Sequence, residues 1–388
     1  MKRKSLIAFI LCLIVLSATL VGCTKDIDYN VVTSYKFWKN KANQAIPQYQ
    51  SYHIMNEFLS DGTIQDGKII GANGKVKKVA FIGFDGTRAD TLPNIMYNDF
   101  ATNSYVDKAE YSGINELSEL GGLYLAYCGG DSKATKQATS TSPGWTTHLT
   151  GVWNDKHGVN DNGIMKNIEY KSILLQYAEK GLNTTLAFDW GDLFDSVFVD
   201  EIDYKLKNNI MTYNMCDIDR PFASNTSIAK KNENVKEKDD LKAKNLDFYN
   251  AVSNPSLQKD SIIDQNNPIL DSAMRDYIID RIEKDDDIIA GIFHRPDTNG
   301  HTDGFTNDNN TYVNAIRNCD NYVYQIMQVI KEREQNNNEE WLILVTADHG
   351  GIKKGHGGQS YAERTIWIAC NKEIDSKYFS KDYTGKIK

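Results

Sequence analysis

The sequence is short of proline, of basic residues relative to acidic ones, and of closely spaced cysteines. Only 7 prolines, together with 27 glycines, occur in 388 residues, which excludes a fibrous or low-complexity chain. A mean hydropathy of -0.51 excludes a protein built from many membrane helices. Because 44 basic residues face 52 acidic ones, we do not expect binding to nucleic acid through charge. The 40% of hydrophobic residues is enough for a large globular core.

No two of the cysteines form a Cys-x-x-Cys pair, so a zinc site built from cysteines is not expected. Cys12 and Cys23 belong to the first segment of the chain. The others are widely spaced, at Cys128, Cys216, Cys319 and Cys370. This spacing is compatible with one or two disulfides in an oxidising compartment, and equally with four buried free thiols.

Residues 1–22 are typical of a bacterial lipoprotein signal peptide. A basic start, Lys2–Lys4, precedes an apolar stretch, Leu6–Val21, that falls short of the roughly 20 residues a membrane span needs. The segment ends in Leu20-Val21-Gly22-Cys23, which resembles the lipobox, where a peptidase cleaves before the cysteine. We therefore expect a lipid on Cys23 and an extracytoplasmic protein held at a membrane surface. A plain signal peptide or an uncleaved anchor is the alternative.

Short apolar runs alternate with helical patterns from residue 75 onward. We expect buried strands at Lys75–Gly83, Thr184–Phe188, Ile288–Phe293, Trp341–Val345 and Thr365–Ala369. We expect helices at Ile168–Lys180, Ser272–Lys284 and Tyr312–Arg333. Strands that alternate with helices predict an α/β fold around a largely parallel sheet flanked by helices.

Two regions depart from this alternation. Residues 23–75 are polar and mixed, and we interpret them as a tether and a peripheral segment with a helix around Tyr35–Phe58. Residues 76–388 then form the main domain. Within it, residues 200–265 are rich in Lys, Asn and Asp, which favours an inserted cap; a solvated helix is the alternative.

Acidic residues and histidines gather where three of the expected strands end. The carboxyl ends of parallel strands meet at one edge of a sheet, where functional groups gather. The side chains concerned are Asp85, Asp297, His301, Asp348 and His349, followed closely by His356. Carboxylate and imidazole suit zinc or a similar divalent ion. One such residue alone is more often a helix cap or a hydrogen-bonded side chain, but four clusters in one α/β chain predict a metal site.

These residues resemble the alkaline phosphatase superfamily, and within it the nucleotide pyrophosphatase and phosphodiesterase branch. The resemblance runs from about Val79 to Ala369 and rests on motifs that follow the order of the family. They are Asp85-Gly86-Thr87-Arg88, Thr141-Ser142-Pro143, Thr150-Gly151, His157-Gly158-Val159-Asn160-Asp161-Asn162 and the later acid and histidine clusters. The resemblance implies an alkaline-phosphatase-like core and an enzyme that hydrolyses phosphate esters.

The resemblance also implies two metal ions, and the ligand types indicate zinc. Asp297, His301 and His356 would hold one ion. Asp85, Asp348 and His349 would hold the other, with Thr141 completing its ligands. Spacing alone leaves open whether the adjacent Asp348 and His349 serve one ion or straddle two.

Thr141 matches the nucleophile of the family, with Ser140 and Ser142 on either side as competing candidates. A threonine hydroxyl is a poor nucleophile until coordination to a divalent cation lowers its pKa. Asn162 stands where the branch carries an asparagine that donates a hydrogen bond to a phosphoryl oxygen; a turn residue is the alternative. The implied reaction passes through a phospho-threonine, which water then hydrolyses.

The predicted substrate is a phosphodiester or a nucleotide pyrophosphate. No clear arginine clamp for a doubly charged monoester is evident, although Arg88, Arg220 and Arg295 are candidates. Trp145 or Trp190 could stack on a nucleobase. The alternatives are a phosphomonoesterase, a phosphonate hydrolase, and a surface protein that binds metal without turnover. A sulfatase is not expected, because its Cys-x-Pro-x-Arg pattern is absent.

Overall fold

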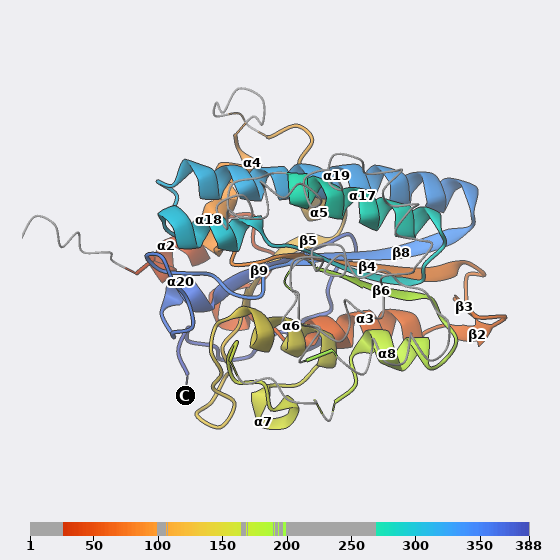
Figure 1. Cartoon of the computed structure of the whole chain (residues 1–388), viewed down its shortest axis with the longest axis horizontal. Helices are drawn as coiled ribbons and strands as arrows, with labels where there is room; N and C mark the ends of the chain where they lie inside the picture. The colour runs from red at the N-terminus through yellow and green to blue at the C-terminus, as the bar shows by residue number, and fades with distance from the viewer. Residues whose placement is uncertain are drawn as a thin grey trace, which may run out of the picture.

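The computed structural model of the chain describes residues 26–98, 106, 108–163, 168, 170–188, 190, 193, 197–198 and 269–387. These residues form a central sheet with helices on both faces (Figure 1). The predicted signal peptide, the cap at 200–265, Cys23, Cys216 and Arg220 lie outside the described residues. Within the described ranges, no helix has the length and apolar character to cross a bilayer.

The middle of the sheet is parallel. β4 (Val76–Phe84) lies between β7 (Ile288–Phe293) and β8 (Glu339–Thr346) and pairs in parallel with both. β6 (Thr184–Ala187) pairs in parallel with β7. Nearly all of β4 is buried on both faces, as expected for a parallel strand covered by helices on each side. This arrangement confirms the predicted fold class.

The outer strands are short or antiparallel. β9 (Thr365–Cys370) runs antiparallel to β8, and β5 (Gly122–Tyr127) runs antiparallel to β9. β1 (Ile46–Pro47) then pairs with β5, and the hairpin of β2 (Thr63–Gln65) and β3 (Lys68–Ile70) joins the start of β4. The parallel centre therefore brings the ends of β4, β7 and β8 to one edge.

Helices cover the two faces of the sheet in separate groups (Figure 1). One group contains α4 (Leu92–Met96), α5 (Gly113–Leu120), α17 (Ile269–Glu283), α18 (Arg295–Asp303) and α19 (Asn310–Asn336). The other contains α3 (Gln50–Ser60), α6 (Thr141–Thr150), α7 (Asn154–His157) and α8 (Ile173–Ala178). Two short helices, α2 (Tyr29–Thr33) and α20 (Tyr361–Arg364), lie near one end of the sheet.

All five predicted strands are present, as β4, β6, β7, β8 and β9. The predicted helices correspond to α17, α19 and the shorter α8. The last begins later than expected because the Ser172 side chain accepts a hydrogen bond from the N–H of Leu175, which caps the helix there. Cys128, Cys319 and Cys370 are buried free thiols, so the structure places no disulfide among them.

Residues 26–75, for which we expected a tether and a peripheral helix, contribute directly to the sheet. They supply β1, β2 and β3, and the longest helix in this segment is α3, which begins at Gln50 rather than at Tyr35. The short strands carry too few residues for an alternating pattern to reveal them. This segment therefore belongs to the same folded body as the strands that follow it.

Asp320 is a buried carboxyl group that joins two helices. It lies on α19, and its Oδ1 accepts a hydrogen bond of 2.7 Å from the N–H of Ile114 in the first turn of α5. Burial raises the pKa of Asp320 to about 7, even though its hydrogen bonds from α5 and Ser112 act in the opposite direction. The folded state therefore binds this proton more strongly than the unfolded chain does.

We expect the stability of the protein to reflect this titration. An unfolded aspartate has a pKa of about 3.9, so the unfolded chain loses this proton at a lower pH than the folded protein does. The free energy of unfolding should therefore fall as pH rises from about 4 to about 7. Asp320→Asn keeps an acceptor for Ile114 and removes the charge. Relative to wild type, it should gain stability across this window, by up to about 4 kcal/mol. Urea unfolding at pH 4.5 and at pH 8 checks this; an equal difference at both pH values would contradict it.

Candidate active site

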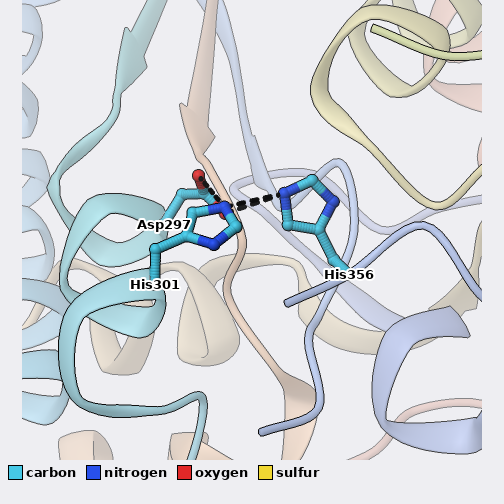
Figure 2. Close-up of side chains that lie close together, drawn as sticks. All are labelled: Asp297, His301 and His356. Atoms are coloured by element: carbon cyan, nitrogen blue, oxygen red, sulfur yellow. Dashed lines mark hydrogen bonds and ion pairs between the residues drawn. The ribbon is translucent and has the colours of Figure 1, made fainter. Parts of the chain in front are cut away.

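The carboxyl ends of β4, β7 and β8 deliver the acidic residues predicted from the sequence. Asp85 follows β4 directly, and Asp348 follows β8 after a single alanine. Asp297 lies in the first turn of α18, the helix that begins just after β7. His356 comes from the loop between β8 and α20, which places it opposite α18 (Figure 2).

The first ligand group consists of Asp297, His301 and His356 (Figure 2). Asp297 and His301 are one helical turn apart on α18, so both side chains lie on the same face. Nε2 of His301 lies 3.3 Å from Oδ2 of Asp297 and 3.0 Å from Nε2 of His356. Nε2 of His356 lies 3.6 Å from Oδ1 of Asp297. Three atoms that can coordinate a metal ion therefore lie close to one another.

The second ligand group consists of Asp85, Asp348 and His349, and all three side chains are fully buried. Nε2 of His349 lies 3.5 Å from Oδ1 of Asp85 and 3.3 Å from Oδ2 of Asp348. The rings of His349 and His356 stack with their centroids 4.0 Å apart. The two groups are therefore neighbours, and Asp348 and His349 belong to the same one.

The three histidines share one orientation toward the backbone. Nδ1 of His301 faces the carbonyl oxygen of Lys354 at 2.9 Å, and Nδ1 of His356 faces that of Thr139 at 3.1 Å. Nδ1 of His349 faces the carbonyl oxygen of Gly350 at 2.7 Å. A carbonyl oxygen only accepts, so in each neutral ring the proton belongs on Nδ1 and the lone pair of Nε2 points at the carboxylates.

The pKa shifts of His349 and Asp348 agree with cation binding. Burial, and then the charge of His356, hold the pKa of His349 well below its usual value, so the ring is neutral. Burial raises the pKa of Asp348 well above its usual range, and the charge of Asp85 raises it further. Among the described residues, Oδ2 of Asp348 and Nε2 of His349 are buried without a hydrogen-bond partner. Their donor set fits a divalent cation, which would satisfy these atoms.

Gly86 brings the two ligand groups close together. Its N–H donates to Oδ1 of Asp348 at 3.1 Å, and a Cβ at this position would lie 2.7 Å from Oδ1 of Asp297. Its φ of 64° also lies in the left-handed region. Glycine is therefore needed both for the backbone conformation and for the close approach of Asp297.

Thr141 is the first residue of α6 and is buried, and Ser140 precedes it as the N-cap. A Cβ on Gly144, one turn along, would lie 2.7 Å from Cβ of Asp348, so this turn lies against the second ligand group. Oδ1 of Asn162 accepts a hydrogen bond of 2.9 Å from the N–H of Ser142. The structure therefore brings Asn162 to the residue next to Thr141.

Three candidate side chains have other surroundings than the substrate roles considered for them. Trp145 is fully buried and donates to Oδ2 of Asp85 at 3.2 Å, so it offers no face to a nucleobase. The guanidinium of Arg88 binds Asp90 and the carbonyl of Phe305. Arg295 is buried and lines a separate polar cavity of about 220 Å³. The ion pair of Arg88 with Asp90 agrees with the absence of a clear arginine clamp in the sequence.

Two further side chains with rings follow β6 and β7. Trp190 is half-buried, with its ring centroid 6.3 Å from that of Phe188. His294, which the sequence interpretation missed, places Nε2 3.8 Å from Oδ2 of Asp297. Its position directly after β7 was the available signal. A nucleobase-stacking role for Trp190 stays a prediction.

Residues 79–354 match the family of type I phosphodiesterases and nucleotide pyrophosphatases. The chain belongs to this family. The match confirms the resemblance on which the site was predicted. Comparison with curated protein sequences gives no match.

Solved structures of other phosphate and phosphonate enzymes are distantly similar. Phosphonoacetate hydrolase from Sinorhizobium meliloti 1021 has 13% identity and a TM-score of 0.41, over 73% of this chain and 60% of that one. Alkaline phosphatase from the Antarctic bacterium TAB5 has 14% identity and a TM-score of 0.41, over 75% and 90%. Phosphonate monoester hydrolase of Agrobacterium radiobacter has 13% identity and a TM-score of 0.38, over 76% and 68%. The chain thus spans less than two thirds of the phosphonoacetate hydrolase.

Substitution of Gly86 should weaken metal binding. Gly86→Ala places a methyl group against Asp297 and strains the backbone, so we expect affinity for zinc to fall by about 10-fold or more. Gly74→Ala is the matched control, because Gly74 has a φ of 75° and nothing within 4 Å of its Cβ position. Calorimetric zinc titration of the metal-free variants gives the comparison. Equal affinities in the two variants would contradict the role of Gly86.

Proposed function

We propose that this family member is a two-metal phosphohydrolase that cleaves phosphodiester or nucleotide pyrophosphate bonds through Thr141. The observation that carries the proposal is the pair of adjacent three-residue groups at one edge of the sheet, beside the start of α6. Asp297, His301 and His356 would hold one divalent ion, and Asp85, Asp348 and His349 the other, with Thr141 beside it. Mixed carboxylate and imidazole ligands favour zinc. When bound, the two ions would lower the pKa of the Thr141 hydroxyl and neutralise charge on the phosphoryl oxygens.

Thr141 is the proposed nucleophile. A bond forms between its Oγ1 and phosphorus while the bond from phosphorus to the leaving oxygen breaks, which gives a phospho-threonine. Water then cleaves this ester and restores the hydroxyl. The helix itself offers few donors to the phosphate, because the N–H of Ser142 is bound to Asn162 and Pro143 has none. We propose that Asn162, whose carboxamide is fixed beside Ser142, donates to a phosphoryl oxygen.

Charge favours a diester over a monoester. Three carboxylates and two divalent ions would leave one positive charge, which balances the single negative charge on the reacting phosphoryl group of a phosphodiester or a pyrophosphate. A monoester carries about one more negative charge and needs a further cation. Arg88, the candidate next to the β4 motif, is already neutralised by Asp90, with Nη2 2.6 Å from Oδ2. The site therefore suits the less charged substrate.

Turnover of bis(p-nitrophenyl) phosphate and of p-nitrophenyl phosphate by the purified zinc-loaded chain tests the proposal. We expect the diester to be preferred, and Thr141→Ala to lose on the order of 10³-fold or more in kcat. Ser142→Ala should keep most of the activity.

A preference for the monoester would make the enzyme a phosphomonoesterase. Cleavage of a phosphonate alone would make it a phosphonate hydrolase, and bound zinc without any turnover would indicate a metal-binding protein. Full activity in Thr141→Ala would exclude Thr141 as the nucleophile.

We also propose that the protein is a lipoprotein on the extracytoplasmic side of a membrane, anchored through Cys23. The support is the sequence of residues 1–23 alone. In a bacterial host, the wild-type chain should fractionate with membranes, and Cys23→Ser should release it into the soluble extracytoplasmic fraction or leave it uncleaved. Identical fractionation and mass of the two proteins would exclude lipidation at Cys23.

A further inference from the structure

The segment just before α3 reaches the loop that carries Asp348 and His349. Gln48 follows β1, and its backbone N–H donates to the carbonyl of Tyr127 at the end of β5 at 2.9 Å. Its side chain is fully buried, and Nε2 donates to the carbonyl oxygen of Asp348 at 2.6 Å. The segment is thus fixed to the sheet on one side and to the ligand loop on the other.

A second connection runs through His148 on α6. Nε2 of His148 lies 3.2 Å from the carbonyl oxygen of Ala347, and Nδ1 lies 2.9 Å from Oγ of Ser51. Burial lowers the pKa of His148 to about 3, so the ring is neutral and has one donor and one acceptor. Because a carbonyl only accepts, Nε2 donates to Ala347 and Nδ1 accepts from the hydroxyl of Ser51.

Two consecutive carbonyl groups of the ligand loop are therefore held by buried side chains. Fixing the carbonyls of Ala347 and Asp348 fixes the peptide planes on either side of the Asp348 Cα, and with them the direction of its side chain. The carboxylate itself is held by the N–H of Gly86. A displacement of this loop would move both Asp348 and His349 away from Asp85.

Burial of the Gln48 side-chain amide costs free energy that packing alone would not offset. Within the described part of the chain, its Oε1 is buried without a hydrogen-bond partner. A buried oxygen without a hydrogen-bond partner is destabilising, so an apolar side chain of the same size would suit a purely structural position better. The bond from Nε2 to Asp348 is the interaction that this residue provides.

We propose that Gln48, Ser51 and His148 are positioning residues for the second ligand group. Gln48 and Ser51 precede residues 79–354, the range that matches the family. The segment before residue 79 would therefore help to position the residues of the metal site. The proposal rests on the proposed function for the identity of the bound ion, while the contacts themselves are independent of it.

Gln48→Met tests the proposal, since methionine keeps the length and removes the donor. Gln176→Met is the matched control, because Gln176 accepts from Tyr52 on α3, away from the ligand loop. Ser51→Ala, which deletes one hydroxyl, is a second variant in case Gln48→Met does not fold. Two measurements are made on the full chain: zinc affinity by competition with a chelator, and amide exchange of residues 347–350 in the metal-free protein.

We expect Gln48→Met to bind one of two zinc ions about 10- to 100-fold more weakly and the other as wild type does. Exchange at residues 347–350 should become faster than in Gln176→Met, and Ser51→Ala should show the same pattern to a smaller degree. Unchanged affinities together with unchanged exchange would overturn the proposal. If the wild-type chain bound no zinc, the proposed function would fail, while faster exchange in Gln48→Met would still support the positioning role.

Discussion

The structure depends on keeping three carboxylates close together at the end of a parallel sheet. Asp85 and Asp348 are fully buried, and Asp297 is nearly so. Burial and mutual repulsion penalise their charges, which is why the pKa of Asp348 is raised. Burial opposes the ionisation of Asp297 as well, but the hydrogen bond to His301 and the charge of His356 hold its pKa below the usual value. Such a cluster is stable as charged ligands only when cations compensate it.

The parallel sheet determines where the cluster forms. Hydrogen-bonded register fixes β7 and β8 on either side of β4, so the residues after each strand meet without long connecting loops. The turn after β4 must be narrow, which Gly86 allows, and α6 must approach Asp348, which Gly144 allows. The ligand geometry is therefore a consequence of strand order and of two glycines.

Much of this could be predicted from the sequence. Buried strands with continuous apolar runs, such as Ile288–Phe293, are recognisable because helices cover both faces. Five of the six proposed ligands could be predicted because they follow strands or lie one helical turn apart, and His356 because it follows the Asp348 and His349 cluster closely in the sequence. β1 and the hairpin of β2 and β3 are too short to produce a pattern. The contacts of Gln48, His148 and Arg88 join residues distant in sequence, and no local pattern encodes them.

The two ligand groups differ in how firmly the fold holds them. The ligand loop after β8 is fixed by Gln48, by His148 and by the N–H of Gly86, and its side chains are fully buried. His301 is half-exposed, and its hydrogen bond with Asp297 raises its pKa to about 8, against the opposing effect of burial. A proton on His301 competes with a cation, whereas the neutral His349 offers its lone pair without that competition. The buried group is thus preorganised beside the first turn of α6, whereas the other group contains His301, which is exposed to solvent.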